Sequence, residues 1–398
     1  MKKRITFIVA LLILALAMVA CGGGDAGNTA ELESQIDDLQ AQLDAANARA
    51  DEAEAAAAES ASTAADSSGA AQEPIEFAGG GNTLQAIIDR GVVKCGVPAG
   101  SSPGFGFLEA DGSWSGQDVD YCRVVAAAVL GDKDAVEFRS TTGTDRFPVL
   151  QSGEVDLLVR QTTWTLSRDT SLGFDFGPTI FYDGQGMMVR KDSGIESLQD
   201  LDGGSVCVAT GTTTEKNLAD VFRLLDIQYE AVVFDDQGDT TRSAFEEGRC
   251  DGYTTDKSGL VSSFALFANP DDYMILPETM SKEPLGPLYR HGDNNWGDIV
   301  NWAVYCTFQA EEKGIDSSNV DDMLASDDPE ILNLLGVEGD LGQAMGISND
   351  FCYQVVKQMG NYAEIYNVNL GPDTQFNLPR GVNSLWTDGG LLYSPPFR

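Results

Sequence analysis

Arg168 stands in a threonine-rich segment that follows a predicted buried strand at residues 155–159. Thr162, Thr163 and Thr165 precede the arginine in this segment. A guanidinium offers a planar fork of N–H donors that matches a carboxylate, and neighbouring hydroxyls can add further donors. These residue types suit a site that holds a carboxylate, and the plainer alternative is a solvated loop arginine in a threonine-rich turn.

A second set of donors is expected at residues 211–214, Gly-Thr-Thr-Thr, directly before a predicted helix. The free backbone N–H groups at a helix start, together with hydroxyls, can bind an anion. The plainer interpretation of Thr213 is an N-cap residue, and the two roles are compatible.

The chain has few residues from which a zinc site or a histidine-based catalytic site could be formed. The only histidine, His291, lies in a polar run typical of a surface loop, and no two cysteines have the C-x-x-C spacing of a zinc site. We therefore expect no metal, no cofactor and no catalytic residue.

The elements that must position these residues alternate between strand and helix patterns. Gly91 follows the first predicted helix as a stop signal. The alternation predicts an α/β fold with parallel sheets and helices on both faces. Strands are expected over residues 92–97, 155–159, 205–209 and 231–234, and helices over residues 83–90, 118–130, 144–152, 213–225 and 240–248.

Length and charge narrow the class of protein. The chain has 398 residues, more than one ordinary domain, and its 42% apolar content suffices for a sizeable core. Acidic residues outnumber basic ones 62 to 25, which gives a formal charge of −37. Such a surface repels phosphate backbones and anionic lipid, so we expect neither a nucleic-acid partner nor electrostatic membrane adhesion.

The N-terminus has the pattern of an export signal. A positive start, residues 1–4, leads into an apolar run over residues 7–20 that is short for a membrane-spanning helix. Small residues before Cys21 and three glycines after it resemble a bacterial lipoprotein processing site. The resemblance implies a signal peptide over residues 1–20 and lipidation of Cys21, with palmitate among the acyl groups. An ordinary signal peptide with an incidental cysteine and an uncleaved anchor helix are the alternatives.

Three segments follow the signal peptide. Residues 21–29 form a glycine-rich tether, residues 30–60 an acidic helical stalk, and residues 61–81 a linker rich in Ala, Ser and Gly. Apolar residues in the stalk alternate steps of four and three, which predicts a coiled coil and a homo-oligomer formed through it. A solvated single helix or a disordered acidic segment is the alternative.

Six cysteines remain when Cys21 is set aside. An even number in an exported chain indicates disulfides, although six cysteines permit fifteen connectivities. The six are Cys95, Cys122, Cys207, Cys250, Cys306 and Cys352.

Several longer segments recur in a characteristic order between residues 82 and 398. They are Gly112-Ser-Trp-Ser-Gly-Gln-Asp-Val-Asp, Arg146-Phe-Pro-Val-Leu-Gln-Ser-Gly, Thr162-Thr-Trp-Thr-Leu-Ser-Arg, Gly211-Thr-Thr-Thr-Glu, Glu247-Gly-Arg-Cys-Asp with Thr255-Asp256, Ser281-Lys-Glu-Pro-Leu-Gly-Pro and Gly381-Val-Asn-Ser-Leu-Trp. Together they resemble the polar amino-acid branch of family 3 solute-binding proteins, and closely its general L-amino-acid-binding members. Each motif is weak alone, but their order and spacing are specific.

The resemblance implies a two-lobed type II periplasmic-binding-protein fold. Lobe 1 would comprise residues 82–184 and 280–398, and lobe 2 residues 185–279. Two crossing strands, around residues 181–188 and 282–289, would form the hinge.

The resemblance also assigns roles to single residues. Arg168 would hold the carboxylate of a free amino acid with support from Thr163, while Asp256 would bind its ammonium group and Thr213 would add a carboxylate contact. Phe105 and Trp164 would lie near the cleft, although core packing is the commoner role of such residues. Lys257 departs from the family pattern and could alter the charge of the side-chain pocket. The family pairs cysteines at the positions of Cys95 with Cys122 and of Cys207 with Cys250, so we expect an extra disulfide between Cys306 and Cys352.

The implied function is capture of free L-amino acids for the permease of an ABC importer, outside the cytoplasm and on a lipid anchor. The chain would then not be an enzyme. A dehydratase of the same fold is one alternative, with Glu215 as the nearest candidate acid, although a glutamate in the first turn of a helix is also favourable electrostatically. A ligand-sensing partner of a receptor is another. The identity of the amino acids is left open by the sequence.

Overall fold

The computed structural model describes residues 81–99, 101–235 and 238–398. These residues belong to one compact unit, Glu76–Arg398. The signal peptide, Cys21, the tether, the stalk and nearly all of the linker lie outside the described residues.

A first five-stranded sheet has the order β5-β1-β6-β15-β7. Strand β1 runs parallel to both β5 and β6, whereas β15 runs antiparallel to β6 and β7. Leu157 and Leu158 of β6 belong to different apolar clusters, as expected when successive side chains point to opposite faces of a sheet buried on both sides. The strands are β1 (Val93–Pro98), β5 (Val136–Thr141), β6 (Leu157–Leu158), β7 (Phe174–Phe176) and β15 (Leu288–Arg290).

A second five-stranded sheet has the order β11-β10-β12-β9-β13. Strand β10 is parallel to β11 and β12, while β9 is antiparallel to β12 and β13. Met187 and Met188 of β9 again belong to different clusters, one on each face. The strands are β9 (Gln185–Arg190), β10 (Gly204–Ala209), β11 (Tyr229–Phe234), β12 (Gly252–Asp256) and β13 (Tyr273–Ile275).

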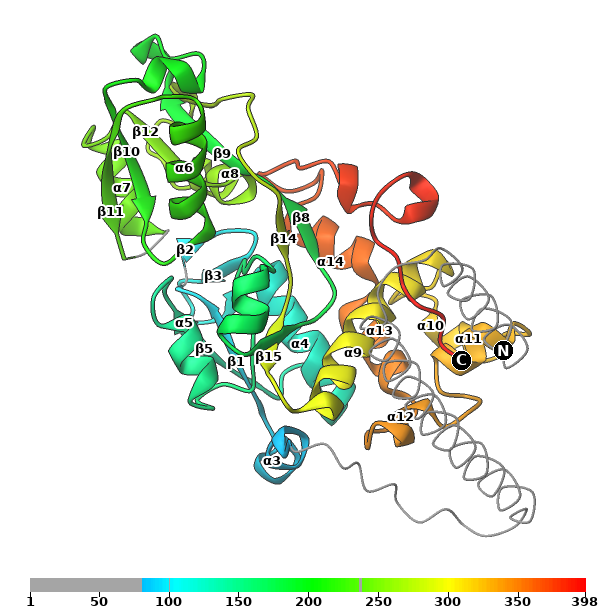
Figure 1. Cartoon of the computed structure of the whole chain (residues 1–398). Coiled ribbons are helices and arrows are strands. Elements are labelled where there is room, and N and C mark those ends of the chain that lie inside the picture. Colours follow the sequence, from blue (N-terminus) through cyan, green and yellow to red (C-terminus); the bar gives the residue numbers. More distant parts are fainter. Residues whose placement is uncertain (1–80, 100, 236–237) are drawn as a thin grey trace, which may run out of the picture. The chain divides into compact units, whose positions relative to one another are not determined.

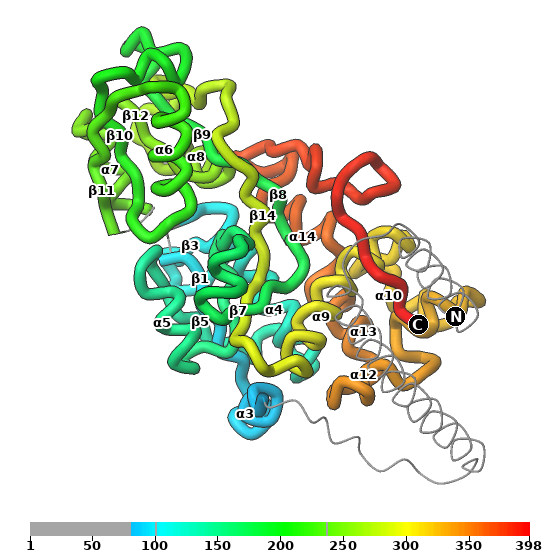
Figure 2. The backbone as a smooth tube through the Cα atoms, in the orientation of Figure 1, coloured from blue at the N-terminus to red at the C-terminus, as the bar shows by residue number. Residues whose placement is uncertain are grey.

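The chain crosses between the two sheets through a pair of short antiparallel strands, β8 (Phe181–Asp183) and β14 (Glu283–Leu285). Figure 1 shows β8 and β14 side by side between the sheets, and the tube in Figure 2 shows the two crossings as neighbouring green and yellow segments. These are the two crossing strands that the resemblance implied. We call the first sheet with its helices lobe 1 and the second lobe 2.

The expectation of wholly parallel sheets is wrong. Strand β9 enters lobe 2 directly from the β8 crossing, and β15 returns to lobe 1 directly from β14. A strand that arrives from the other lobe enters its sheet from the hinge side, and both β9 and β15 run antiparallel to their neighbours. The hinge therefore makes both sheets mixed.

Helices cover both sheets. In lobe 1, α4 packs on β1 and against α9 and α13 of the later chain, and a row of small residues, Ala126 to Ala128, is buried there. The helices are α3 (Thr83–Arg90), α4 (Gln117–Leu130), α5 (Arg146–Gln151), α6 (Thr213–Leu224), α7 (Asp239–Glu246), α8 (Lys257–Phe264), α9 (Asn294–Glu312), α10 (Val320–Met323), α11 (Pro329–Leu334), α12 (Leu341–Ala344), α13 (Phe351–Met359) and α14 (Tyr362–Asn369).

A small sheet of β2 (Ser101–Ser102), β3 (Gly106–Leu108) and β4 (Trp114–Ser115) leads into α4. Gly116 joins β4 to the helix with φ of +122°, and a Cβ atom there would lie 2.2 Å from the carbonyl oxygen of Phe105. Only glycine fits such a position. The second glycine of the Gly-x-x-x-Gly motif is thus explained by a close backbone approach.

The C-terminal segment contacts the hinge. Asn383 accepts the backbone N–H of Tyr182 at 2.7 Å and donates to the Tyr182 carbonyl at 3.1 Å. Tyr182 is the middle residue of β8, so this side chain occupies the edge of the strand that β14 leaves open. The later chain thereby satisfies the backbone of a crossing strand.

Three disulfides lie within the lobes. Cys95–Cys122 ties β1 to α4, Cys207–Cys250 lies in lobe 2, and Cys306–Cys352 ties α9 to α13. The pairing is the one that we expected, and none of the three bonds crosses the hinge.

Candidate ligand-binding site

Arg168 lies in a single π-helical turn, Ser167–Ser171, in the segment that follows β6. Its side chain is only 5% exposed, and Nη1 donates to the carbonyl oxygen of Thr163 at 2.7 Å. Burial lowers the pKa of Arg168 to about 10, partly offset by the charges of Glu283 and Asp256. The guanidinium is therefore charged at neutral pH. Among the described residues, no carboxylate oxygen comes within the 4.0 Å of an ion pair with it.

Thr163 and Thr213 meet across the cleft, as their predicted shared role requires. The two hydroxyl oxygens are 3.3 Å apart, although Thr163 belongs to lobe 1 and Thr213 begins α6 of lobe 2. Both donate to the same oxygen, Oε2 of Glu283, and the Thr213 bond measures 2.9 Å. Thr163 and Thr213 are therefore joined through a carboxylate of the protein itself.

Glu283 is the functional residue that sequence reasoning missed. It is 1% exposed at the start of β14, and its other oxygen, Oε1, accepts from Ser281 and from Asn217 Nδ2, the latter at 2.7 Å. Four donors from the hinge and both lobes thus satisfy one carboxylate. The available signal was an acidic residue, Glu283, within a predicted crossing strand, where a charge is costly unless it is hydrogen-bonded.

Asp256 faces this cluster in a different state. It ends β12 at the N-cap position of α8 but makes no side-chain capping bond, and it is 4% exposed. Its Oδ1 has no hydrogen-bond partner among the described residues. Burial, and then the charges of Asp183 and Glu283, raise its pKa well above the usual value, while Arg168 and Arg146 oppose the rise. The arrangement is suited to a cationic ligand group.

Asp183, which is partly buried, joins the buried Asp256 and Glu283 in a group of three acids. It lies opposite Glu283 in the β8–β14 pair, and burial raises its pKa to about 6, although the Ser258 hydroxyl, the Gly184 N–H and the Ser258 N–H lower it. The sequence offered no sign that Asp183 would face Asp256. The position of Asp183 follows from the register of β8 and β14 at the hinge, which places it opposite Glu283.

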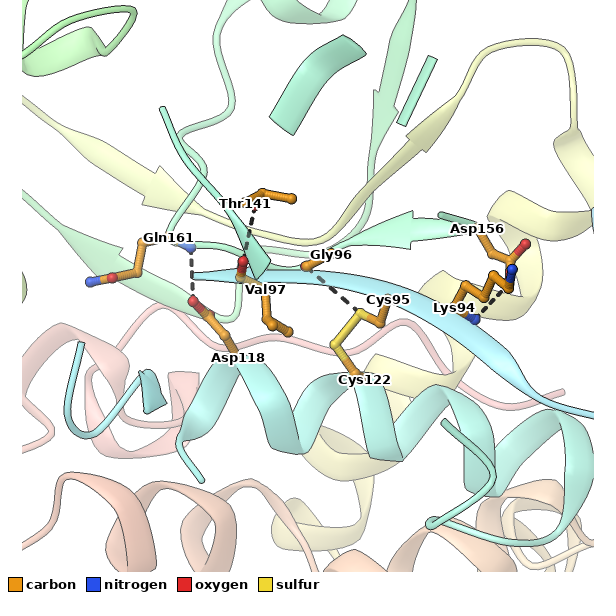
Figure 3. The surroundings of a disulfide bond; sticks show 9 residues. All are labelled: Lys94, Cys95, Gly96, Val97, Asp118, Cys122, Thr141, Asp156 and Gln161. Atoms are coloured by element: carbon orange, nitrogen blue, oxygen red, sulfur yellow. Dashed lines mark hydrogen bonds between the residues drawn. A yellow bond between two sulfur atoms is a disulfide. The ribbon is translucent and has the colours of Figure 1, made fainter. Parts of the chain in front are cut away.

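Gln161 has a strained backbone at the mouth of lobe 1. Its φ is +36°, a region that non-glycine residues seldom adopt. Figure 3 shows its N–H held by the carboxylate of Asp118 on α4, at 2.8 Å, beside the Cys95–Cys122 disulfide. Its Nε2 reaches Ser258 of lobe 2 at 3.5 Å. Strain of this kind often marks a functional site.

The start of α6 corrects one expectation. The N-cap is Thr212, whose Oγ1 accepts from the backbone N–H of Glu215 at 3.0 Å, so the N-cap interpretation of Thr213 is wrong. Glu215 in turn accepts the N–H of Gly211 at 2.9 Å. Thr213 is left free to face the cleft, and Glu215 has a structural role at the helix start.

The two predicted aromatic residues pack against the protein. Phe105 is buried and meets Phe181 edge to face at 5.3 Å. Trp164 is 44% exposed, stacks on Phe176 at 5.7 Å and donates from Nε1 to Asp169 at 2.7 Å. Contact of either ring with a ligand stays a prediction.

The ammonium group of Lys257 contacts neighbouring residues of lobe 2. Its Nζ donates to Thr279 Oγ1 at 2.7 Å and lies 3.4 Å from the carbonyl oxygen of Pro277. These contacts give the ammonium partners outside the Asp256 cluster, and the structure gives no support for its expected effect on the pocket charge.

The cleft is nearly shut. Ser262 Oγ of lobe 2 donates to the carbonyl oxygen of Pro103 of lobe 1 at 2.7 Å. A cavity of about 10 Å³ lies between the lobes beside Asp256 and Gln161, which is room for roughly one water molecule. An amino acid is larger, so the lobes must separate before one can enter.

The described ranges contain neither a metal-binding cluster nor a membrane-spanning helix. No group of three or more His, Cys, Asp or Glu side chains within them could hold a metal ion. No helix within the same ranges is long and apolar enough to cross a bilayer. His291, the only histidine of the chain, lies half exposed at 3.3 Å from Asp175.

Known proteins resemble this chain in sequence and in structure. The profile of the bacterial extracellular solute-binding proteins, family 3, matches residues 93–335. The general L-amino acid-binding periplasmic protein AapJ of Rhizobium johnstonii is 48% identical over 81% of this chain and 94% of its own length. The glutamate/glutamine/aspartate/asparagine-binding protein BztA of Rhodobacter capsulatus is 50% identical over 81% and 95%. A solved periplasmic binding protein of Brucella ovis, with glutathione bound, is 46% identical over 80% of this chain and all of its own, with a TM-score of 0.78. The two-lobed fold expected from the sequence is confirmed.

Proposed function

The chain belongs to the bacterial extracellular solute-binding proteins of family 3, and from that membership we propose that it captures free L-amino acids between its lobes for an ABC importer. One observation carries the proposal. Arg168 and Asp256, a guanidinium and a carboxyl group, are buried on opposite lobes and within electrostatic reach of each other, and neither has an ion-pair partner within 4.0 Å among the described residues.

A free amino acid carries a carboxylate and an ammonium group, which are the ion-pair partners that Arg168 and Asp256 lack. Burying a zwitterion removes water from a carboxylate and an ammonium group, and each charge must then be paired. In our proposal Arg168 binds the carboxylate through its planar fork, and Asp256 binds the ammonium group through its unpartnered Oδ1.

Thr163 and Thr213 would add contacts to the carboxylate only after a change of partner. A threonine hydroxyl has one proton, and both of these donate to Glu283. Contact with a ligand carboxylate therefore requires each hydroxyl to rotate away from Glu283. We infer that Glu283 holds the two hydroxyls in place before the ligand arrives.

Closure of the lobes would turn binding into a signal. Ligand binding stabilises the closed arrangement, and the closed form is the one that a permease can recognise. The short β8–β14 pair supports this scheme because few residues have to absorb the motion.

We further propose that the protein acts outside the cytoplasm, is anchored through a lipid on Cys21, and is not an enzyme. The relatives named above are binding proteins by their names. Glu215, the candidate acid of a dehydratase, is already hydrogen-bonded at the start of α6 and has a structural role there.

Calorimetric titration of the full chain in mild detergent, against the common L-amino acids, tests the proposal. We expect saturable binding of several of them, and no turnover of prephenate or arogenate. Absence of heat and of thermal stabilisation across the whole panel would overturn the proposal.

A further inference from the structure

Asn383, near the C-terminus, pairs with a crossing strand as a neighbouring strand would. It is 4% exposed, its Oδ1 accepts the backbone N–H of Tyr182 at 2.7 Å, and its Nδ2 donates to the Tyr182 carbonyl at 3.1 Å. Opposite Tyr182 in β14 stands Pro284, which has no N–H, and the Pro284 carbonyl accepts from Trp164 instead. Both backbone groups of Tyr182 are therefore satisfied from the C-terminal segment, which Figure 1 shows reaching β8 in orange and red.

The other crossing strand is attached to lobe 1 along its own outer edge. Pro284 accepts the N–H of Trp164 at 2.8 Å, and Leu285 forms a β-bridge with Thr163. Leu285 is also buried in the apolar core of lobe 1, and Tyr182 packs against the same core. The Tyr182–Pro284 pair is thus attached to lobe 1 on both strands.

Asn383 is itself held on lobe 1 by Arg380. The Arg380 guanidinium donates to both carboxylate oxygens of Glu311 on α9, at 2.8 Å and 3.2 Å, and its Nε donates to the carbonyl oxygen of Asn383 at 2.9 Å. We call residues 380–383 the hinge brace. The brace lies beyond residues 93–335, so it is an addition to the part of the fold that the family profile matches.

The chain passes into lobe 2 directly beyond the pair that the brace holds. The next pair of β8 and β14 is Asp183 with Glu283. Beyond Asp183, the carbonyl oxygen of Gly184 accepts the N–H of Lys257 of α8 at 2.8 Å. On the returning chain, Met280 packs against an apolar core of lobe 2. The turning point between the lobes therefore lies at the Asp183–Glu283 pair.

The two acids at this turning point reach across to lobe 2. Asp183 Oδ2 accepts the N–H of Ser258 at 3.1 Å, and Glu283 Oε2 accepts the hydroxyl of Thr213 at 2.9 Å. A shift of Tyr182 away from lobe 1 would carry Asp183 with it, because the two residues are adjacent in β8. The geometry of the closed cleft thus depends on where β8 is held.

We propose that Asn383 is a positioning residue for ligand binding: by holding Tyr182 on lobe 1, it fixes the turning point of closure, so that the two acids meet their partners on lobe 2. The inference rests on the proposed function and adds a residue to it. Asn383 contacts β8 and Arg380 rather than the groups that would bind the ligand. Its loss should therefore lower the population of the closed form, which weakens the binding of every ligand by the same factor.

Calorimetric titration of the full chain and of its Asn383→Ala variant with L-glutamate, L-glutamine and L-alanine tests the inference. The variant loses two hydrogen bonds to β8, so its affinity for each amino acid that the wild type binds should fall by about five- to tenfold. Asn349→Ala is the matched control and should bind like the wild type. The Asn349 side chain also joins two backbone groups, the N–H of Gln343 at 2.9 Å and the carbonyl of Gly339 at 3.4 Å, but it does not contact the hinge.

The distance between the lobes gives a readout that a merely structural role would not change. Spin labels on two introduced cysteines, Glu137→Cys of β5 and Arg223→Cys of α6, both at exposed positions, report this distance. We expect Asn383→Ala to broaden the distance distribution of the ligand-free protein, and saturating ligand to restore the closed distance of the wild type. Asn383→Asp keeps an acceptor for the Tyr182 N–H and loses only the donor, so it should show the same changes at smaller size, and it tests the inference should Asn383→Ala fail to fold.

The outcomes separate this inference from the function beneath it. A wild type that binds no amino acid overturns the proposed function, and the distances between the lobes then decide on the brace alone. Wild-type affinities in Asn383→Ala, or an unchanged distance distribution, overturn the brace. A loss confined to one ligand does so too, because it would place Asn383 beside that ligand. An equal loss in Asn349→Ala also overturns the brace, because it would reflect general destabilisation.

Discussion

Glu283 and Asp256 are both buried carboxylates in one cleft, and their surroundings differ completely. Glu283 on the hinge accepts four hydrogen bonds, from residues of both lobes and from Ser281 just before its own strand. Asp256 on lobe 2 retains an oxygen with no partner among the described residues. Buried polar groups are normally satisfied, so a satisfied one is part of the framework and an unsatisfied one needs a separate explanation. We take Glu283 as framework and Asp256, with Arg168, as the groups that await a ligand.

The largest expected effect comes from removing a ligand-facing charge. Arg168→Ala should weaken the binding of every amino-acid ligand by about 30- to 4,000-fold, because it leaves the ligand carboxylate buried without a counter-ion. Calorimetry on the full chain measures this loss, with Arg223→Ala as the exposed control. An unchanged affinity would remove Arg168 from the site.

The framework and the ligand-facing acid should respond to amide substitution with opposite signs. Glu283→Gln replaces an acceptor oxygen by a donor, so two of the four donors lose their acceptor, and the ligand-free protein should lose about 3 kcal/mol of stability. Asp256→Asn removes the cost of ionising a buried, unpaired carboxyl group, so the ligand-free protein should gain about 1 kcal/mol at neutral pH while losing ligand binding. Melting temperatures of the two ligand-free variants test the pair. Destabilisation by both would show that Asp256 is framework too.

Acidification should stabilise the ligand-free protein. Burial raises the pKa of Asp118 to about 7 and that of Asp183 to about 6, whereas an unfolded aspartate titrates near 3.9. Between about pH 4 and pH 7 the folded state therefore binds more protons than the unfolded state, and its stability increases as the pH falls. The exposed Asp321, whose pKa a hydrogen bond from Lys357 lowers, loses its contribution only at lower pH.

Melting temperature measured without ligand should thus rise from pH 7 to pH 5. Asp118→Asn keeps an acceptor for the Gln161 N–H but does not titrate there, so it should flatten the rise. Ligand affinity should move the other way, because Asp256 must be ionised to bind an ammonium group. A melting temperature that falls steadily from pH 7 to pH 5 would contradict the burial of these acids.

The smallest effect is expected at Trp164. Its ring already stacks on Phe176, and its N–H is bonded to Asp169. Trp164→Ala should change amino-acid affinity by less than about threefold, a difference of roughly 0.6 kcal/mol. A loss approaching that of Arg168→Ala would mean that the ring turns onto the ligand when the lobes move.

Sequence reasoning succeeded where the signal was local. The helix closed by Gly91 ends where expected, because Gly91 adopts the left-handed conformation of a C-cap at φ of 73°. The predicted strand over residues 205–209 is β10 with one additional residue. The helix over residues 213–225 is α6 to within a residue. Such boundaries depend on neighbouring residues, which the sequence displays directly.

It failed where distant segments meet. The antiparallel entry of β9 and β15 follows from the hinge, which no local pattern records. The strand expected over residues 155–159 is shorter in the structure, Leu157–Leu158, although the N–H groups of Asp156 and Val159 still donate to carbonyl oxygens of β1. Glu283 was visible within a motif, but its importance depends on which donors face it, and those come from both lobes.

The placement of the disulfides has a practical consequence. Each bond staples a single lobe, and the six cysteines of the described chain are all engaged. Two fluorescent dyes, one on an introduced cysteine of each lobe, would therefore report the distance between two lobes that are each stabilised by disulfides. Because no disulfide links the two lobes across β8 and β14, reducing agents would break bonds within each lobe without changing the connection between the lobes. The labelled protein would in this way serve as an optical sensor for its ligand.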